Sequence, residues 1–364
     1  MIIMESPRYI RSFDALKHLG GIASEYGTRA LIIAGERAFN AVQDKVDRSL
    51  SAADIEYQVV IYKGFCSMVH IERAMSQIGD FTADLVLGIG GGTVMDASKK
   101  IAQDLGLPII TVPTIASTCA AWTPLSVMYD EHGAVVAEDW LSHSPKAVIA
   151  DTEAIMKAPV RYLIAGIGDS IAKWFEPNFV RQALDVTADC FLRSTLELAR
   201  ASYQIVSDNG EKAIEQCKAR TPGPELDAVI DACIAVTGML SGIAGDVGRF
   251  AVAHGFYNAF SAVPVSKTLL HGEIVALGIL LQESLRNERF VIADKELLSF
   301  CQRMGLPTNW QEAGLRELTD DELELVVSRM DAGDSCKALR ELPLEVDLSA
   351  RRLKEVLAAQ HDAQ

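Results

Sequence analysis

The pattern of hydrophobic and polar positions changes near residue 159. Before this point, short apolar runs alternate with amphipathic segments, which predicts strands and helices in turn. Such alternation implies right-handed βαβ crossovers and a parallel sheet that is covered on both faces. Strands are expected over 30–34, 57–62, 85–89, 109–112, 126–129, 134–137 and 147–150, helices over 36–49, 69–78 and 93–105, and a turn at Glu131-His132-Gly133.

After Pro159, Ala, Leu and Ile recur at helical spacing to the end of the chain. Gly and Pro interrupt the pattern at Pro222-Gly223-Pro224, at Gly245 and at Gly305-Leu306-Pro307. We therefore predict two domains, an α/β domain with a parallel sheet over residues 1–158 and an all-α domain over residues 159–364.

The composition is that of an ordinary globular protein. Of the 364 residues, 49% are hydrophobic and 23% are charged, enough for two domains with sizeable cores. The net charge of −15 argues against nucleic acid or an anionic membrane as a partner. The seven cysteines are scattered and contain no CxxC pair, which favours reduced thiols over a disulfide framework. The first six residues have no signal architecture, and no apolar stretch reaches the roughly 18–20 residues of a membrane helix. We expect a cytoplasmic protein.

A glycine-rich turn, Gly90-Gly91-Gly92-Thr93, follows the third expected strand and opens the next expected helix. Glycines at such a junction let backbone N–H groups approach a pyrophosphate, and the helix N-terminus attracts its negative charge. The usual dinucleotide fingerprint is GxGxxG in the first βα turn, whereas the pattern here is GxGGGT. The glycines alone fit both a dinucleotide site and a tight turn without a ligand.

Three segments of the helical half carry candidate metal ligands. They are Gly166-Ile167-Gly168-Asp169, Ala253-His254-Gly255 and His271-Gly272-Glu273. One carboxylate and two imidazoles suit a divalent metal that keeps an open position for substrate. Taken alone, the two histidines are a weak signal, because a histidine on an apolar helix is often structural. The glycine-rich turn upstream favours a metal enzyme.

Together, these segments resemble the glycerol dehydrogenase branch of the metal-dependent alcohol dehydrogenases, other members of which are called iron-containing. The resemblance implies a dehydroquinate synthase-like architecture, with a dinucleotide-binding α/β domain, an all-α metal-binding domain and the active site between them. The matching pieces, in family order, are Gly90-Gly91-Gly92-Thr93 with Asp96 and Lys99, Val112-Pro113-Thr114-Ile115-Ala116-Ser117-Thr118, Leu125-Ser126-Val127-Met128-Tyr129, Gly166-Ile167-Gly168-Asp169, His254 and His271-Gly272-Glu273.

The resemblance also implies roles for individual residues. Asp169, His254 and His271 would be the catalytic metal ligands. In iron-binding members a further histidine lies four residues after the aspartate, where this chain has Lys173, so we expect three ligands and zinc rather than iron. The metal would activate the substrate hydroxyl. The cofactor would be held by Gly91, Gly92, Thr93 and Asp96 at its pyrophosphate, and by Thr114, Ser117, Thr123, Leu125 and Tyr129 around its phosphates, ribose and nicotinamide.

One departure from the family concerns the cofactor. Glycerol dehydrogenases carry an aspartate after the first long strand, where it meets the adenosine ribose, and Gly35 fills that position here. Without the acid, and with Arg37 two residues on, there is room for the 2′-phosphate of NADP. Alternatively, Glu36 makes the ribose contact and Arg37 is solvated. The cofactor is therefore expected to be NAD or NADP.

Two further departures concern the substrate. Cys119 replaces an aspartate that helps glycerol dehydrogenases hold a polyol, and Lys173 replaces a small neutral residue. Losing an anion and gaining a cation beside the metal favours a substrate with a carboxylate. Both variants resemble a bacterial hydroxycarboxylate dehydrogenase subgroup. Alternatively, Lys173 reaches solvent or pairs with Glu176. The sequence does not explain Tyr257, which stands where the family often has a second histidine after His254.

We therefore predict an NAD(P)-linked oxidoreductase that transfers hydride between the nicotinamide and a small 2-hydroxycarboxylate or 2-oxo acid. The nearest alternative is a glycerol or diol dehydrogenase with a modified pocket. A more remote alternative is a dehydroquinate synthase-like lyase, which needs more basic residues than the predicted cleft offers. The expected partners are a small-molecule substrate and further copies of the chain in a homo-oligomer, as is common in the family.

Overall fold

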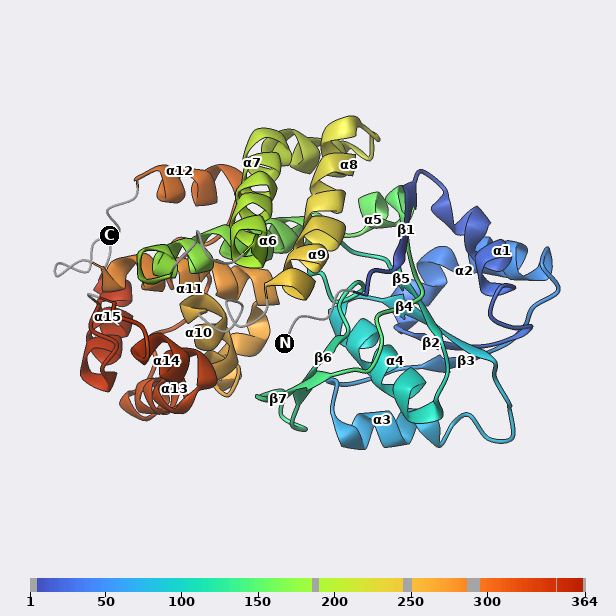
Figure 1. Ribbon diagram of the computed structural model, residues 1–364, viewed down its shortest axis with the longest axis horizontal. Coiled ribbons are helices and arrows are strands. Elements are labelled where there is room, and N and C mark those ends of the chain that lie inside the picture. Colours follow the sequence, from blue (N-terminus) through green and yellow to red (C-terminus); the bar gives the residue numbers. More distant parts are fainter. Residues whose placement is uncertain (1–4, 185–189, 245–250, 287–294, 345, 363–364) are drawn as a thin grey trace.

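The computed structural model describes residues 5–184, 190–244, 251–286, 295–344 and 346–362. An α/β half and a helical half lie at opposite ends of its long axis (Figure 1). The α/β half contains β1 (Arg8–Ser12), a 3-10 turn (Ala15–His18), α1 (Leu19–Ala23), β2 (Arg29–Ala34), α2 (Glu36–Ser51), β3 (Glu56–Ile61), α3 (Met68–Met75), β4 (Leu85–Gly90), α4 (Gly92–Leu105), β5 (Ile109–Pro113), β6 (Leu125–Tyr129), β7 (Val135–Trp140), β8 (Ala147–Asp151) and α5 (Thr152–Lys157).

Six parallel strands form the main sheet, in the order β1-β8-β5-β4-β2-β3. Helices α1 and α2 pack on one face, and α3 and α4 pack on the other (Figure 1). Strands β2, β4, β5 and β8 are buried on both faces, which explains why they are continuous apolar runs in the sequence. The predicted fold class is confirmed.

Strand β1 was not predicted from the sequence. It is an edge strand that pairs with β8, and Arg8 and Arg11 interrupt its apolar positions. Polar residues on an edge strand discourage pairing with other chains, and they also weaken the hydrophobic signal. Because β1 comes first, the glycine-rich turn follows the fourth strand rather than the third. The seven predicted strands are all present, with ends that differ from the prediction by at most three residues.

Strands β6 and β7 form a separate antiparallel hairpin that projects toward the helical half (Figure 1). Its turn is the predicted Glu131-His132-Gly133, with Gly133 at a φ of 84°. The hairpin contacts the helical half directly, because the backbone N–H of Val135 donates to Oγ of Ser261 over 2.9 Å. Tyr129, at the end of β6, therefore lies at the boundary between the two halves.

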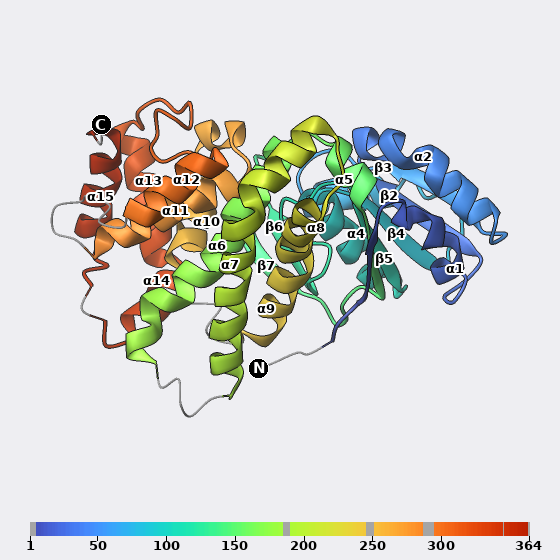
Figure 2. The same ribbon diagram turned by 90° about the horizontal axis from the view of Figure 1, so that it is seen from above.

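Helix α6 runs through the middle of the molecule and begins the helical half (Figures 1 and 2). Two predicted breaks are confirmed: Pro222-Gly223-Pro224 separates α7 from α8, and Gly305-Leu306-Pro307 follows α12. Gly245 lies outside the described residues. The elements are α6 (Arg161–Val180), a 3-10 turn (Arg181–Ala183), α7 (Cys190–Ala219), α8 (Pro224–Asp231), a π-helical turn (Ala232–Val236), α9 (Thr237–Ile243), α10 (Val252–Phe260), a 3-10 turn (Pro264–Thr268), α11 (His271–Leu285), α12 (Lys295–Met304), α13 (Asp320–Ala332), α14 (Asp334–Arg340) and α15 (Ala350–Asp362).

The continuous helix made by α8, the π-helical turn and α9 corrects one expectation. From Pro224 to Ile243 it is long and apolar enough to cross a membrane by length and composition, with a mean hydropathy of 1.7. However, 56% of its apolar window is buried inside the protein. Asp227 and Asp231 near its first end each form an ion pair of 2.8 Å with Arg11 of β1. We interpret it as a core helix.

One hydrophobic core joins the two halves. Trp122 of the α/β half belongs to the same buried cluster as Phe256 of α10. The backbones also meet, because a Cβ on Gly166 of α6 would lie 1.9 Å from the carbonyl oxygen of Ala116. Helix α6 is therefore packed directly on the segment that follows β5. The domain boundary at residues 158 and 159 stays a prediction, and it falls between α5 and α6.

Candidate active site

The three expected metal ligands, Asp169, His254 and His271, come together from three helices. Their donor atoms all lie within 4.8 Å of one another. Nε2 of His254 is 3.3 Å and Nε2 of His271 is 3.4 Å from the same oxygen, Oδ1 of Asp169. The aspartate side chain is 4% exposed, whereas the imidazoles are 21% and 27% exposed. The carboxylate of the cluster is therefore buried in the core, and the two imidazoles are partly accessible to solvent.

Glycines let the helices that carry Asp169 and His271 cross at close range. A Cβ on Gly272 would lie 1.7 Å from the carbonyl oxygen of Ala165, and a Cβ on Gly168 would lie 2.4 Å from the carbonyl oxygen of Gly272. Any larger residue would force α6 and α11 apart, because interiors are close-packed. In both segments, therefore, the ligand stands next to the glycine that makes room for it.

Glu176, two turns after Asp169 on α6, orients His254. Its Oε1 accepts a hydrogen bond of 2.9 Å from the backbone N–H of His254, and its Oε2 is 2.8 Å from the ring Nδ1. Nε2 is consequently the nitrogen that faces Asp169. A carboxylate on the far ring nitrogen is the usual outer partner of a metal-binding histidine. Glu176 thus bonds His254, and the expected alternative of a pair with Lys173 is not formed among the described residues.

The charges of the cluster suit a cation. Burial alone would raise the pKa of Asp169, but His271 and His254 beside it hold that pKa well below its ordinary value. Burial lowers the pKa of His254, and the nearby Glu176 and Asp169 more than offset this, so that it rises to about 9. His254 therefore lies in a strongly negative environment. One carboxylate oxygen and two imidazole nitrogens fit a divalent metal ion.

The glycine-rich turn and the segment after β5 meet at one edge of the sheet. Gly91 is the N-cap of α4, and the backbone N–H of Thr114 donates to the carbonyl oxygen of Gly90 over 3.0 Å. A Cβ on Gly91 would lie 2.6 Å from Cδ1 of Ile115, so the two segments are in direct contact. The first N–H groups of a helix lack partners within it, and they form a natural binding site for a pyrophosphate.

The other expected cofactor residues surround this edge. Thr114 and Thr123 are buried, Ser117, Leu125 and Tyr129 are half-buried, and Thr93 is exposed at the start of α4. They follow the carboxyl ends of β4 and β5 or belong to the chain around β6, which is where ligands of open α/β sheets bind. Their contacts with a cofactor stay a prediction.

Asp96 and Lys99 lie inside the protein rather than on a solvated helix face. Lys99 is 1% exposed, and its Nζ is 3.0 Å from Oδ1 of Asp96. The same ammonium donates to the carbonyl oxygens of Thr123, over 3.0 Å, and of Leu125. Oδ2 of Asp96 accepts a hydrogen bond from the backbone N–H of Val127. The contacts of Asp96 are thus internal, and the pair fixes β6 to α4.

Cys119 and Lys173, the two residues expected to contact the substrate, lie near each other and near Asp169. Sγ of Cys119 is 3.8 Å from Oγ of Ser241 on α9. Burial raises the pKa of Cys119 despite the nearby lysine, so its thiol is neutral. Burial lowers the pKa of Lys173, but the carboxylates of Asp169 and Glu176 raise it above its ordinary value. No hydrogen bond or ion pair joins the Lys173 ammonium to another of the described residues, so these carboxylates act on it without direct contact.

Known proteins are similar to this chain in sequence and in fold. A family model described as iron-containing alcohol dehydrogenase matches residues 6–152. The chain is 32% identical to hydroxycarboxylate dehydrogenase A of Escherichia coli K12, over 90% of this chain and 89% of that protein. It is 33% identical to a glycerol dehydrogenase of Thermotoga maritima, over 88% and 87%. The crystal structure of glycerol dehydrogenase from Schizosaccharomyces pombe superposes with a TM-score of 0.84 at 27% identity, covering 100% of this chain and 92% of that one.

The chain belongs to the iron-containing alcohol dehydrogenase family. The resemblance drawn from the motifs is confirmed, and membership makes the chain an oxidoreductase that acts on CH–OH groups.

Three contacts of this alcohol dehydrogenase were not predicted from its sequence. They are those of Glu176 with His254, of Ser241 with Cys119, and of Tyr257 with His271. Glu176 follows Asp169 by seven residues, so it shares a helix face with it, and that spacing could have revealed it. Ser241 has no such signal, because only the packing of α9 brings it to Cys119.

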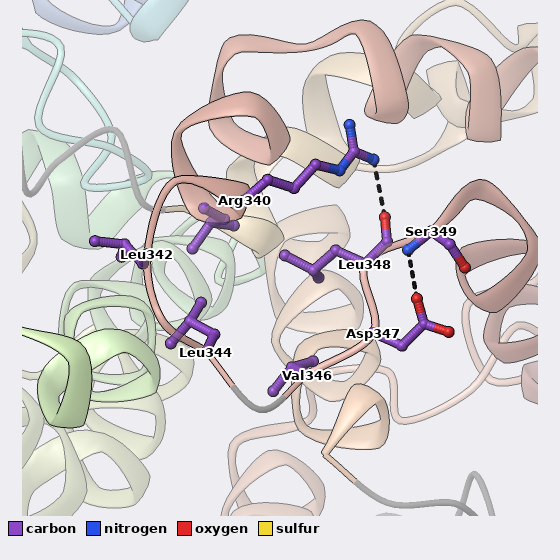
Figure 3. Close-up of a pocket in the computed structure, with 8 residues that line it drawn as sticks. Arg340, Leu342, Leu344, Val346, Asp347, Leu348 and Ser349 are labelled. Atoms are coloured by element: carbon purple, nitrogen blue, oxygen red, sulfur yellow. Dashed lines mark hydrogen bonds between the residues drawn. The ribbon is translucent and has the colours of Figure 1, made fainter.

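A separate cavity of about 300 Å³ is lined by the end of α14 and by the loop that leads to α15 (Figure 3). None of the expected site residues lines it. Arg340 bridges it by donating to the carbonyl oxygen of Leu348 over 2.8 Å. Its walls are Leu339, Arg340, Leu342, Leu344, Val346, Asp347, Leu348 and Ser349. We assign it no part in the reaction.

Proposed function

We propose that this alcohol dehydrogenase transfers hydride reversibly between NAD(P) and a small 2-hydroxycarboxylate or 2-oxo acid. The observation that carries the proposal is Lys173, a buried cation one helical turn from Asp169 that forms no direct ion pair with another described residue, although Asp169 and Glu176 are near enough to raise its pKa. A substrate carboxylate would make a direct ion pair with it. The hydroxycarboxylate dehydrogenase among the relatives is consistent with this substrate class.

We further propose zinc as the metal, held by Asp169, His254 and His271. Lys173 occupies the position from which iron-binding members contribute a fourth ligand, and a protonated amine has no lone pair to donate. A bound zinc ion would act as a Lewis acid that polarises the substrate's hydroxyl or carbonyl oxygen.

The protein's own residues would position the reactants. Glu176 keeps Nε2 of His254 directed at the metal site, and Lys173 would bind the carboxylate, so that the carbinol carbon faces the nicotinamide. Oxidation sends a hydride to the nicotinamide and a proton to solvent, and yields the 2-oxo acid. We propose NAD or NADP as the acceptor, a cytoplasmic location and a homo-oligomer.

Glycerol or another diol is the second candidate substrate. The side chains of Cys119 and Ser241 are neutral, and a polyol could bind beside them without a countercharge. Glycerol dehydrogenases stand among the relatives at the same level of identity, such as those of Thermotoga maritima and Pseudomonas putida.

Substitution of Lys173 separates the two candidates. Lys173→Met keeps most of the side-chain volume and removes the charge, and Lys173→Thr removes both. Since a charge-assisted hydrogen bond contributes about 1.5–3 kcal/mol, kcat/KM for 2-oxobutyrate should fall roughly ten- to a hundredfold in both variants. The value for neutral diols should change much less. Adding Cys119→Asp to Lys173→Thr should shift preference further toward glycerol.

The measurement is steady-state oxidation and reduction of the nicotinamide at 340 nm with both substrate classes. Lys157→Thr is a matched control, because this lysine is 56% exposed and pairs with Glu153 away from the cluster. If Lys173→Met weakens acids and diols equally, the lysine is structural and glycerol becomes the better candidate.

A further inference from the structure

The two imidazoles of the metal cluster are held in different ways. Glu176 hydrogen-bonds Nδ1 of His254. Among the described residues, no hydrogen bond to Nδ1 of His271 is formed. Instead, the ring of Tyr257 packs edge-on against the His271 ring, with centroids 4.2 Å apart and an interplanar angle of 78°. His271 thus has an aromatic ring beside it where His254 has a carboxylate.

Tyr257 is in turn held from the other half of the molecule. Its hydroxyl is 2.6 Å from the hydroxyl of Tyr129, at the end of β6. Tyr257 lies on α10 and is 8% exposed, so little water competes for this bond. The pair is a direct polar link between the strand expected to line the nicotinamide and α10, the helix that carries His254.

Hydrogen bonds to neighbouring elements hold Tyr129 and its strand, β6, in place. Its backbone N–H donates to the carbonyl oxygen of Cys66 over 2.8 Å. Earlier in β6, Ser126 Oγ donates to the carbonyl oxygen of Asp96 over 2.9 Å, and Lys99 donates to the carbonyl oxygen of Leu125. Strand β6 is therefore fixed to α4, the helix that opens at the glycine-rich turn.

We propose that Tyr257 is a positioning residue, whose ring orients His271 and whose hydroxyl, through Tyr129, sets the distance between the metal cluster and the nicotinamide. This rests on the proposed function for the existence of both groups at the site. It also accounts for the tyrosine at a position where the family often has histidine. The ring and the hydroxyl have separate effects, and each can be removed alone.

The test uses Tyr257→Phe, Tyr129→Phe, the double variant and Tyr257→Ala in the metal-loaded, full-length enzyme. Either Phe variant deletes the bridge and keeps both rings, so kcat should fall about three- to tenfold. The double variant should be no slower than the slower single variant, because both remove the same bond. The primary isotope effect on kcat with 4-deuterated reduced cofactor should rise, since hydride transfer becomes the slower step.

Metal affinity tests the ring without any substrate. Titration of zinc against a chromophoric chelator should give affinities within about twofold of wild type for both Phe variants. Tyr257→Ala should weaken zinc binding about ten- to a hundredfold, the usual effect of removing an outer partner of a metal ligand. Tyr9→Phe is the control. It deletes another hydrogen bond between the halves, 2.8 Å from Tyr9 to Asp231, and should leave kcat and zinc affinity unchanged.

Several results would overturn the proposal. If the effects of the two Phe variants multiply in the double variant, the hydroxyls act independently. If kcat is unchanged in both, the bridge has no positioning role. If Tyr257→Ala binds zinc like wild type, the ring does not orient His271. The kinetic comparison uses whichever carbonyl compound the wild type reduces, so an error in the proposed substrate class changes the assay and not these ratios.

Discussion

The expected cofactor edge and the metal cluster are linked through Tyr129 and Tyr257, but they are assembled differently. The expected cofactor residues lie in one stretch of chain, between Gly91 and Tyr129, whereas the metal cluster draws on positions 169, 254 and 271. At the expected cofactor edge, the backbone at a strand-to-helix junction would be the principal binding group. At the metal cluster, side chains from α6, α10 and α11 would bind the ion, so the geometry of the site depends on how these helices cross.

This difference decides what a substitution can damage. A junction built from backbone tolerates changes in most side chains, provided that a glycine keeps the approach to the ligand open. The cluster tolerates neither loss of a donor atom nor displacement of a helix. We therefore expect the largest effects of substitution at the metal cluster and smaller, more selective ones at the cofactor edge.

Removal of a ligand should have the largest effect. Asp169→Ala, His254→Ala or His271→Ala should each abolish metal binding and lower turnover by about a thousandfold or more, because two remaining donors do not hold the ion. The proteins should stay folded, since the α/β half does not depend on the cluster. Elemental analysis, turnover with reduced cofactor and circular dichroism measure the three effects.

Wild-type enzyme, analysed alongside, should contain about one zinc-class ion per chain. Chelation should remove activity, and zinc should restore it. An enzyme that keeps full turnover with its metal shown to be absent would contradict the assignment of all three ligands.

Two glycine substitutions compare the regions directly. Gly272→Ala places a Cβ 1.7 Å from a backbone oxygen of α6, and backbone cannot rotate away. We expect about 3 kcal/mol or more of lost unfolding free energy, together with weaker zinc binding. Gly91→Ala places its Cβ 2.6 Å from the end of the Ile115 side chain, which can move. It should cost about 1 kcal/mol and weaken cofactor binding while zinc content is retained.

Urea unfolding measures the loss of stability in the two variants. Their zinc content and a fluorescence titration with cofactor measure the two kinds of binding. Gly21→Ala is a suitable control for alanine in place of glycine, because a Cβ there meets no atom within 4 Å. Equal losses of stability in Gly272→Ala and Gly91→Ala would mean that helix crossing is no more constrained than the cofactor turn.

The sequence predicts the cofactor edge more completely than the metal cluster, for the same physical reason. Strands β2, β4 and β5 and the turn at Gly90 to Thr93 are local signals, so their places follow from apolar runs and glycines. The ligands could be proposed from residue chemistry and from the family resemblance. Their convergence could not, because it depends on contacts such as that between Gly272 and Ala165.

Near Cys119 and Tyr257, too, the contacts that could not be predicted from the sequence join distant elements. Ser241 reaches Cys119, and Tyr257 reaches Tyr129, through packing that leaves no periodic trace. Strand β1 was missed for a different reason, because an edge strand with two arginines lacks the apolar run that identifies the buried strands. In each case the sequence does not show which elements of the fold pack or pair with each other.

Cofactor choice should show the smallest and most selective effect. Gly35 follows β2 and caps α2, and its backbone N–H donates to the carbonyl oxygen of Ile89 beside the glycine-rich turn. Its φ of −74° is open to any residue, and a Cβ would lie 3.5 Å from Val94, an ordinary contact. Gly35→Asp should therefore fold normally, and its carboxylate should shift preference from NADPH toward NADH about tenfold by repelling the 2′-phosphate.

Gly35→Asn provides the same shape and cap without the charge, so it should leave the ratio of kcat/KM for the two cofactors near that of wild type. A wild type that ignores NADPH would instead indicate that an acid such as Glu36, now 3.6 Å from Lys63, already discriminates against it.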